Sequence, residues 1–214
     1  MNILVIGAGG VGASMASIAE TRSFFTQFVL ADISLSRAEE AIALLDDRSK
    51  FVAEQVDARD MGAVKALIQK VKADVVVNAC DPRMNEPIFN AAFEAHCNYI
   101  DMAMNLSEPH ASNPYEEVGS PLGADQLAAD QAWRDRGLLA LVGMGVEPGL
   151  SDVFARYAAD NLFDTIDEIG VRDGSNLSMA FINPNTPALT RSPVSTVRGN
   201  PAARRPATNL TSEA

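Results

Sequence analysis

A glycine-rich loop lies between an apolar run and a helix-compatible segment at the start of the chain. Residues 2–6 (Asn-Ile-Leu-Val-Ile) form a short apolar run without alternation, which is typical of a parallel strand covered on both faces. The next residues carry glycine at positions 7, 9 and 12, in the pattern Gly-x-Gly-x-x-Gly. Residues 11–22 are small and favour a helix that packs closely on a sheet. This order predicts the first strand, loop and helix of a Rossmann-type dinucleotide-binding fold.

The loop also predicts where the pyrophosphate of a dinucleotide would bind. Glycine at these positions allows a tight turn, a close approach of the backbone to the pyrophosphate and close packing of helix on strand. The helix that begins here presents free N–H groups and the positive end of its dipole to the phosphates. The residues predicted to form this part of the site are Gly7, Gly9, Gly10, Val11 and Gly12.

An acidic residue follows the second apolar run at 28–31. Asp32 stands 20 residues past Gly12, where a carboxylate can accept hydrogen bonds from ribose hydroxyls and repel a 2′-phosphate. We therefore predict NAD as the cofactor. Ser34 and Arg37 lie just beyond and could hold a phosphate if Asp32 turned away, so NADP is the alternative.

Strand-like and helix-like segments then alternate along the chain. Further strands are predicted at 51–56, 74–79, 98–102 and 138–142. Helices are predicted at 34–48, 60–71, 85–96, 123–136 and 151–161. This alternation predicts an α/β protein with a doubly wound parallel sheet. A long loop at 103–120 interrupts the rhythm, and such loops are often functional in folds of this kind.

Small residues end the predicted strand at 74–79, where ligands bind outside the carboxyl ends of parallel strands. Asn78, Ala79 and Cys80 leave room there for the ribose and nicotinamide of the cofactor. Cys80 has no histidine nearby in sequence, which favours a small buried thiol over a nucleophile. Asp57 and Ala58, after the third strand, are predicted to border the adenine, with an ordinary helix-capping aspartate as an equal alternative for Asp57.

Two further segments place acidic residues at strand ends on the same edge of the predicted sheet. One is Tyr-Ile-Asp, which ends at Asp101, a predicted cofactor-binding residue. The other is the glycine-rich turn and helix start at 145–152, which contain Glu147 and Asp152. A carboxylate at this edge could bind a substrate ammonium group or act as a base on an amine. Asp152 is as easily explained as an N-terminal partner of the helix dipole.

Charge and cysteine content narrow the classes of function. The 214 residues carry a formal net charge of −11, which argues against a nucleic-acid partner and favours a small-molecule substrate. The opening apolar run is too short to span a membrane and lacks the basic start of a signal peptide, so we expect a cytoplasmic protein. Cys80 and Cys97 are expected to be reduced thiols. His96 and His110 are isolated, and no metal site is expected.

These motifs together resemble the saccharopine dehydrogenase family, in the branch of saccharopine reductases, lysine dehydrogenases and carboxynorspermidine dehydrogenases. The resemblance spans about residues 1–177 and is carried by four motifs, which are the loop at 7–12, Asn-Ala-Cys-Asp-Pro at 78–82, Tyr-Ile-Asp at 99–101 and Glu-Pro-Gly-Leu-Ser-Asp at 147–152. Relatives often carry Asp-Pro-Gly where this chain has Glu-Pro-Gly, a change that keeps the carboxylate.

The resemblance implies hydride transfer between NAD(P) and the amine-bearing carbon of an amino acid or polyamine-type substrate. The protein would align the two carbons and move a proton of the amine or of water. The candidate catalytic residues are Asp130, Glu147 and Asp152, although Asp130 also fits an ordinary solvated residue on a helix. The family also implies a homodimer of the full-length enzyme.

The domain organisation departs from the family near the end of the chain. We predict a nucleotide-binding domain at 1–146, the start of a truncated α+β substrate and dimerisation domain at 147–177, with a strand opening at 165–172, and a tail at 178–214 that is disordered or foreign to the family. An oxidoreductase that is impaired by truncation is the first hypothesis. A module that binds NAD(P) without turnover, or a nucleotide-sensing protein, is the alternative.

Overall fold

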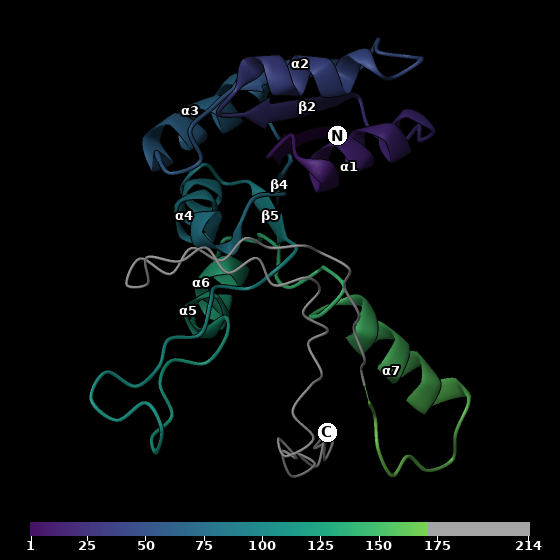
Figure 1. Ribbon diagram of the computed structural model, residues 1–214. Helices are drawn as coiled ribbons and strands as arrows, with labels where there is room; N and C mark the ends of the chain where they lie inside the picture. Colours follow the sequence, from purple (N-terminus) through teal and green to yellow (C-terminus); the bar gives the residue numbers. More distant parts are fainter. Residues whose placement is uncertain (171–214) are drawn as a thin grey trace, which may run out of the picture. The chain divides into compact units, whose positions relative to one another are not determined.

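In the computed structural model, residues 1–170 are described, and six parallel strands form one sheet (Figure 1). The strands are β1 (Asn2–Ile6), β2 (Gln27–Asp32), β3 (Phe51–Gln55), β4 (Val75–Asn78), β5 (Asn98–Asp101) and β6 (Ala140–Leu141). Their order across the sheet is β3-β2-β1-β4-β5-β6, and every pairing is parallel. This is the strand order of the Rossmann fold, and it confirms the predicted fold class. The chain changes direction across the sheet between β1 and β4, which places a ligand crevice at their carboxyl ends.

Helices cover both faces of the sheet. They are α1 (Gly10–Glu20), α2 (Leu35–Ala43), α3 (Met61–Val71), the short 3-10 helix η1 (Pro82–Met84), α4 (Asn85–Glu94), α5 (Ala124–Ala128) and α6 (Asp130–Asp135). In β1, Ile3 and Val5 pack in a cluster with residues of α1 and α2, whereas Leu4 and Ile6 pack with residues of α3, α4 and α6. Because successive side chains of a strand point to opposite faces, a continuous apolar run serves both layers.

Several predicted elements differ from the observed ones. The helix predicted at 34–48 ends at Ala43, and the Asp47 carboxylate instead accepts a hydrogen bond from the Ser49 N–H in a local turn, which competes with the helix. The helix predicted at 123–136 is divided into α5 and α6 at Ala129. The Ala129 N–H is shared there between the carbonyl of Asp125, at 3.2 Å, and that of Gln126, at 3.3 Å. The last strand is only Ala140–Leu141.

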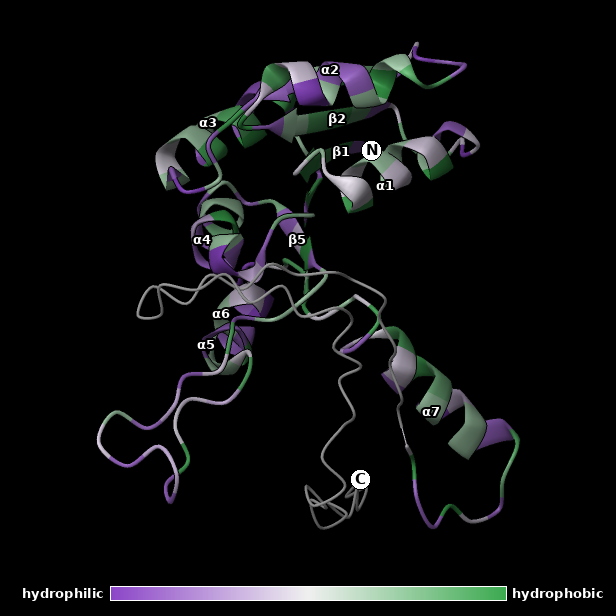
Figure 2. Cartoon of the chain, viewed as in Figure 1, coloured by the Kyte–Doolittle hydropathy of each residue, from purple (hydrophilic) through white to green (hydrophobic). Residues whose placement is uncertain are grey.

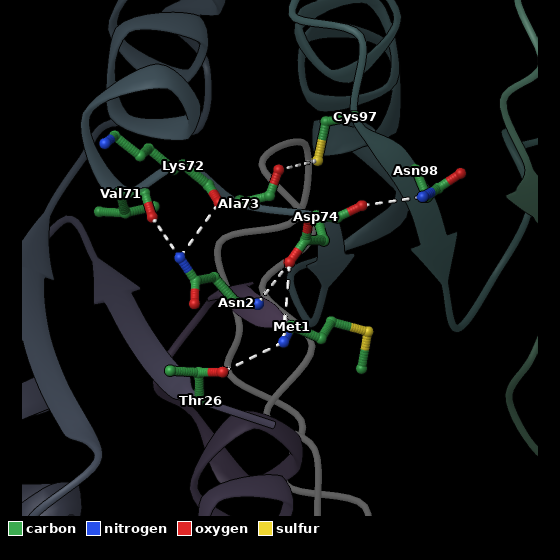
Figure 3. Close-up of polar contacts among 9 residues, drawn as sticks. All are labelled: Met1, Asn2, Thr26, Val71, Lys72, Ala73, Asp74, Cys97 and Asn98. Atoms are coloured by element: carbon green, nitrogen blue, oxygen red, sulfur yellow. Dashed lines mark hydrogen bonds and ion pairs between the residues drawn. The ribbon is translucent and has the colours of Figure 1, made fainter. Parts of the chain in front are cut away.

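The amino-terminal edge of the sheet is held by a cluster of polar contacts around Asp74 (Figure 3). The Asp74 carboxylate accepts a hydrogen bond from the Asn2 N–H at 2.6 Å, and the Asn98 side chain donates to the Asp74 carbonyl at 2.9 Å. The Cys97 thiol donates to the carbonyl of Ala73 at 3.2 Å. These bonds fix the starts of β1, β4 and β5 against one another, at the edge opposite the predicted ligand site.

Met1–Phe154 form one compact unit, and a second unit begins at Ala155. Helix α7 (Leu150–Asn161) begins in the first unit, and none of its residues is buried. Figure 2 shows hydrophobic residues along it. Phe154 belongs to this helix, and its exposed fraction is 63%. The strand predicted at 165–172 is not formed up to residue 170, and the remainder of that segment and the tail at 178–214 lie outside the described residues.

Candidate functional site

The glycine loop follows β1 at the carboxyl edge of the sheet. Gly7 has φ +108°, in the region that favours glycine, and its N–H donates to the Ala31 carbonyl at 2.7 Å. A Cβ on Gly7 would lie 2.8 Å from the carbonyl oxygen of Ala79, and a Cβ on Gly12 would collide with the Gly7 carbonyl. The fold itself therefore requires glycine at these two positions, as close packing of helix on strand predicts.

The middle of the loop is open. A Cβ on Gly9 or Gly10 would meet no atom within 4 Å, and Gly9 has an ordinary extended backbone with φ −75°. Within the described residues no side chain caps the first turn of α1, and that turn contains no acidic residue. Free N–H groups at a helix N-terminus attract anions. Because nothing in the fold explains glycine at 9 and 10, while a pyrophosphate close to the backbone would, the loop fits the predicted cofactor group. Val11, in the same turn, is 48% exposed.

Asp32 ends β2 with its side chain turned toward the loop. Its carboxylate is buried and accepts hydrogen bonds from the Ala8 N–H at 2.8 Å and the Ser34 N–H at 3.0 Å. The exposed Arg37 guanidinium lies 3.6 Å from the same carboxylate. Asp32 thus ties the glycine loop to the end of β2, and Arg37 stands at the outer side of this pair.

The residues predicted next to the nicotinamide lie at the end of β4. The Asn78 side chain is buried, donates to Asn85 Oδ1 at 2.7 Å and accepts from the Cys80 N–H at 2.9 Å. The Cys80 thiol donates to the Ile6 carbonyl at 3.2 Å, and burial raises its pKa to about 11. A thiol with such a pKa is a poor nucleophile, as the sequence predicts, although Cys80 is half-buried rather than fully buried. Ala79 packs against Gly7.

The residues predicted to border the adenine lie after β3. The Asp57 carboxylate forms an ion pair with Arg59 at 2.8 Å, which lowers the pKa of Asp57. The alternative of a helix cap is wrong for Asp57, because the cap of α3 is Asp60, whose side chain accepts from the Ala63 N–H at 3.0 Å. Ala58 is partly buried and packs on the core.

A buried polar network joins the end of β5 to the glycine-rich turn at 143–149. Asp101 is fully buried, and its two carboxylate oxygens accept from the Gly143 N–H and from Gln126 Nε2, each at 2.7 Å. Gln126 in turn accepts from the Asn105 N–H at 2.8 Å. Burial raises the pKa of Asp101, and it also raises the pKa of the neighbouring Tyr99 hydroxyl far above its usual range. Both Asp101 oxygens are thus used within the protein, while a direct contact with cofactor remains a prediction.

The two acidic segments meet at this edge, as predicted. The Met144 N–H donates to the Asp101 carbonyl at 2.8 Å, which holds the turn against β5. The Asp152 carboxylate accepts from the Gly149 N–H at 2.9 Å and so closes the turn at the start of α7. Glu147 is exposed and forms no hydrogen bond or ion pair within residues 1–170. It is therefore the carboxylate of the turn that is free for a ligand.

Asp130 lies apart from this network. It is on the surface of α6, where its carboxylate forms an i,i+4 ion pair with Arg134 at 2.8 Å. This is the arrangement of a solvated helical residue, the alternative that the sequence left open.

The sequence gives no sign of three amides of the site, of which Asn85 and Gln126 are buried and Asn105 is half-buried. Asn85, Asn105 and Gln126 carry no motif, and Gln126 stands in a predicted helix like any other polar residue. Only its burial and its contact with Asp101 reveal its part in the site.

Residues 3–141 match the model of the saccharopine dehydrogenase NADP binding domain. The chain belongs to the saccharopine dehydrogenase family. This confirms the resemblance and supports a nicotinamide cofactor. The match includes the glycine loop, Asp32 and the β4 and β5 ends, and it stops before the 143–149 turn.

Two curated proteins are similar over most of this chain. Carboxynorspermidine synthase of Vibrio cholerae is 34% identical over 81% of the chain and 43% of its own length. Carboxyaminopropylagmatine dehydrogenase of Synechocystis is 28% identical over 87% of the chain and 45% of its own length. The chain thus spans less than half the length of these relatives. Among solved structures, saccharopine dehydrogenase (L-Glu forming) of Saccharomyces cerevisiae shares the fold, with a TM-score of 0.55, 15% identity and coverage of 75% of this chain and 31% of that one.

None of the helices within residues 1–170 could span a lipid bilayer. In the same part of the chain, no group of three or more histidine, cysteine, aspartate or glutamate side chains is arranged to hold a metal ion.

Proposed function

We propose that this chain forms the nucleotide-binding part of an NAD(P)-dependent oxidoreductase that acts on the amine-bearing carbon of an amino acid or polyamine-type substrate. The observation that carries the proposal is the open backbone at Gly9 and Gly10, before an uncapped helix, in a chain of this family. The curated relatives, named for carboxynorspermidine and carboxyaminopropylagmatine, support a substrate that bears both amines and a carboxylate.

Each part of the carboxyl edge has a role in this proposal. The first turn of α1 binds the pyrophosphate through its N–H groups, and Gly7 and Gly12 give the loop its shape. The small residues Ala79 and Cys80 leave space for the nicotinamide side of the cofactor. When bound, the nicotinamide supplies the hydride acceptor or donor for oxidation or reduction at the amine-bearing carbon. The protein aligns the two groups and excludes water.

We propose NAD as the preferred cofactor, with NADP as the alternative. The Asp32 carboxylate is fixed at the end of β2 by Ala8 and Ser34, where its charge opposes a 2′-phosphate. The family name points to NADP, and Arg37 is the residue that would bind its extra phosphate. The preference for NAD or NADP therefore depends on whether the negative charge of Asp32 or the positive charge of Arg37 has the larger effect on the 2′-phosphate.

Glu147 is our candidate for the group that accepts the amine or water proton. It is exposed on the turn that Asp101 fixes, and it has no partner among the described residues. Asp152 already accepts a hydrogen bond from Gly149, so its first role is to hold the turn. The ion pair with Arg134 gives Asp130 a surface role, and catalysis by Asp130 remains an untested prediction.

Nucleotide titration and a turnover assay test the proposal separately. NADH and NADPH are titrated by fluorescence, and oxidation of carboxynorspermidine, saccharopine and lysine is then followed through nucleotide absorbance. We expect NADH to bind more tightly than NADPH. Absence of binding for both nucleotides would contradict the proposal. Binding without turnover of any substrate would favour the alternative of a nucleotide-binding module.

A further inference from the structure

A cavity of about 300 Å³ lies between the start of α4 and the long loop that follows β5. Its walls come from η1 and the first turn of α4, from the two arms of the 103–123 loop and from the start of α5. All of these elements belong to the first compact unit. The volume is at the lower end of the range for small-molecule sites, which is about 300–1,000 Å³.

Hydrogen bonds hold the walls of this cavity in place. Glu108 and Ser120 form a two-bond antiparallel bridge, at 3.0 and 2.9 Å, that closes the two arms of the loop. The Gly123 N–H donates to the Asn105 carbonyl at 2.9 Å, and the Asn105 N–H is bound by Gln126. The loop is therefore tied to the same buried network that positions the 143–149 turn.

The charges around the cavity are mostly negative and uncompensated. Glu86, Glu108 and Asp125 line it, and none of the three forms an ion pair within the part of the chain that the structure describes. Arg83 also lines the cavity, but it donates two hydrogen bonds to Asp81, at 2.8 and 3.0 Å. That pair lowers the pKa of Asp81 to about 2, so the guanidinium charge is already matched by a carboxylate.

Apolar groups complete the lining. Pro82, Leu106 and Pro121 supply apolar surface beside the carboxylates.

We propose that this cavity binds the terminal primary ammonium group of an aliphatic amine, at the end of the substrate that does not react. An ammonium group has three donors and one positive charge, which suit the separated carboxylates of the lining. The apolar residues contact the methylene chain. No group of three carboxylates within residues 1–170 is close enough to hold a metal ion, which favours an organic cation. The inference rests on the proposed function, because it assigns one end of that substrate.

The test is calorimetric titration of the whole 214-residue chain with norspermidine and with lysine, in the presence of saturating NADH. A Glu108→Gln/Asp125→Asn double variant removes two carboxylates from the cavity. A Glu39→Gln/Glu40→Gln double variant makes the same charge change on exposed positions of α2 that do not line the cavity. We expect the cavity variant to weaken amine binding about tenfold, since two exposed ion pairs are lost, and the α2 variant to leave it within about twofold. NADH affinity and melting temperature should stay unchanged in both variants.

The outcomes separate this inference from the proposed function. Equal weakening by the two double variants would show a general attraction of cations to an acidic protein and would overturn the site. Normal NADH binding without amine binding would overturn the site alone, whereas failure of NADH to bind would overturn the proposed function. Stronger binding of norspermidine than of lysine would support the site with a polyamine as the source of the ammonium group, and the reverse would support it with an amino acid.

Discussion

The buried carboxylate of Asp101 accepts a hydrogen bond from the N–H of Gly143 at 2.7 Å, although the two residues are 42 positions apart in sequence. This bond connects the end of β5 to the turn that carries Glu147. Gln126 binds the other oxygen of the same carboxylate and connects it to the loop around the cavity. One aspartate thus joins three segments of the candidate site.

Replacing Asp101 with alanine should destabilise the fold and displace the turn. The change leaves the Gly143 N–H and the Gln126 amide buried without an acceptor, at a cost of about 2–4 kcal/mol in the free energy of unfolding. Urea unfolding measures the loss, and Asp135→Ala, at an exposed position of α6, is the matched control. If the free energy of unfolding falls less in Asp101→Ala than in the control, the network does not support the fold.

The Asp101→Asn variant should reveal the protonation of Asp101 through the pH dependence of stability. Burial raises the pKa of Asp101 in the folded state above its unfolded value of 3.8, so the contribution of this group is greatest at low pH and is lost as pH rises through the folded-state pKa. The free energy of unfolding of wild type should therefore exceed that of the variant most at pH 4, and this excess should shrink toward pH 7. Urea unfolding at several pH values checks this, and a difference that grows with pH would contradict it.

The glycines of the loop should separate folding from nucleotide binding. Gly12→Ala forces a Cβ into the Gly7 carbonyl and should destabilise the fold by about 1–3 kcal/mol. Gly9→Ala places its Cβ in open space, so the melting temperature should stay near that of wild type while NADH affinity falls about tenfold or more. Wild-type affinity in the Gly9→Ala variant would show that the pyrophosphate does not approach this residue.

Asp32 and Arg37 should set the choice between NADH and NADPH. Asp32→Asn keeps an acceptor for the N–H of Ala8 but removes the charge, so the ratio of NADPH to NADH affinity should rise about tenfold. Arg37→Ala should weaken NADPH alone. Fluorescence titration of both nucleotides measures the ratio, and an unchanged ratio in both variants would remove these residues from cofactor selection.

Both thiols should react slowly in the folded protein. Burial raises the pKa of Cys80 to about 11 and that of Cys97 to about 12, which leaves roughly one thiolate in a thousand or fewer at pH 8. Alkylation by iodoacetamide should be at least about tenfold slower in native protein than in urea. Comparable rates in the two states would argue for an exposed, activated cysteine.

The fold class could be predicted because it depends on local patterns. The apolar runs at 2–6 and 28–31, the glycine loop and the alternation of strands and helices all stand in the sequence, and the structure confirms the doubly wound parallel sheet. Element ends were less predictable. The helix after Ser34 stops early because the turn at Asp47 competes with it, and that competition depends on a hydrogen bond between specific neighbours.

The polar network of the site could not be predicted from spacing. Asp101 was identified as a site residue, yet both of its oxygens bind within the protein, to Gly143 and Gln126. Nothing in the sequence distinguishes Gln126 from an exposed helical glutamine, because burial is a property of the assembled sheet and loop. Asp57 and Asp60 are both suitable helix caps by residue type, but α3 begins after Asp60, so Asp60 is the cap.

The family, the sheet and the glycine loop follow from residue types at fixed local spacing, so the sequence alone is enough to predict them. Which polar side chains are free for a ligand depends instead on how the chain packs. Asp101 and Asn78 are bound within the protein, Glu147 is exposed on the turn, and Glu86, Glu108 and Asp125 lie around one cavity. A buried polar group must find a hydrogen-bond partner, and contacts between distant segments of the packed chain set which partner that is.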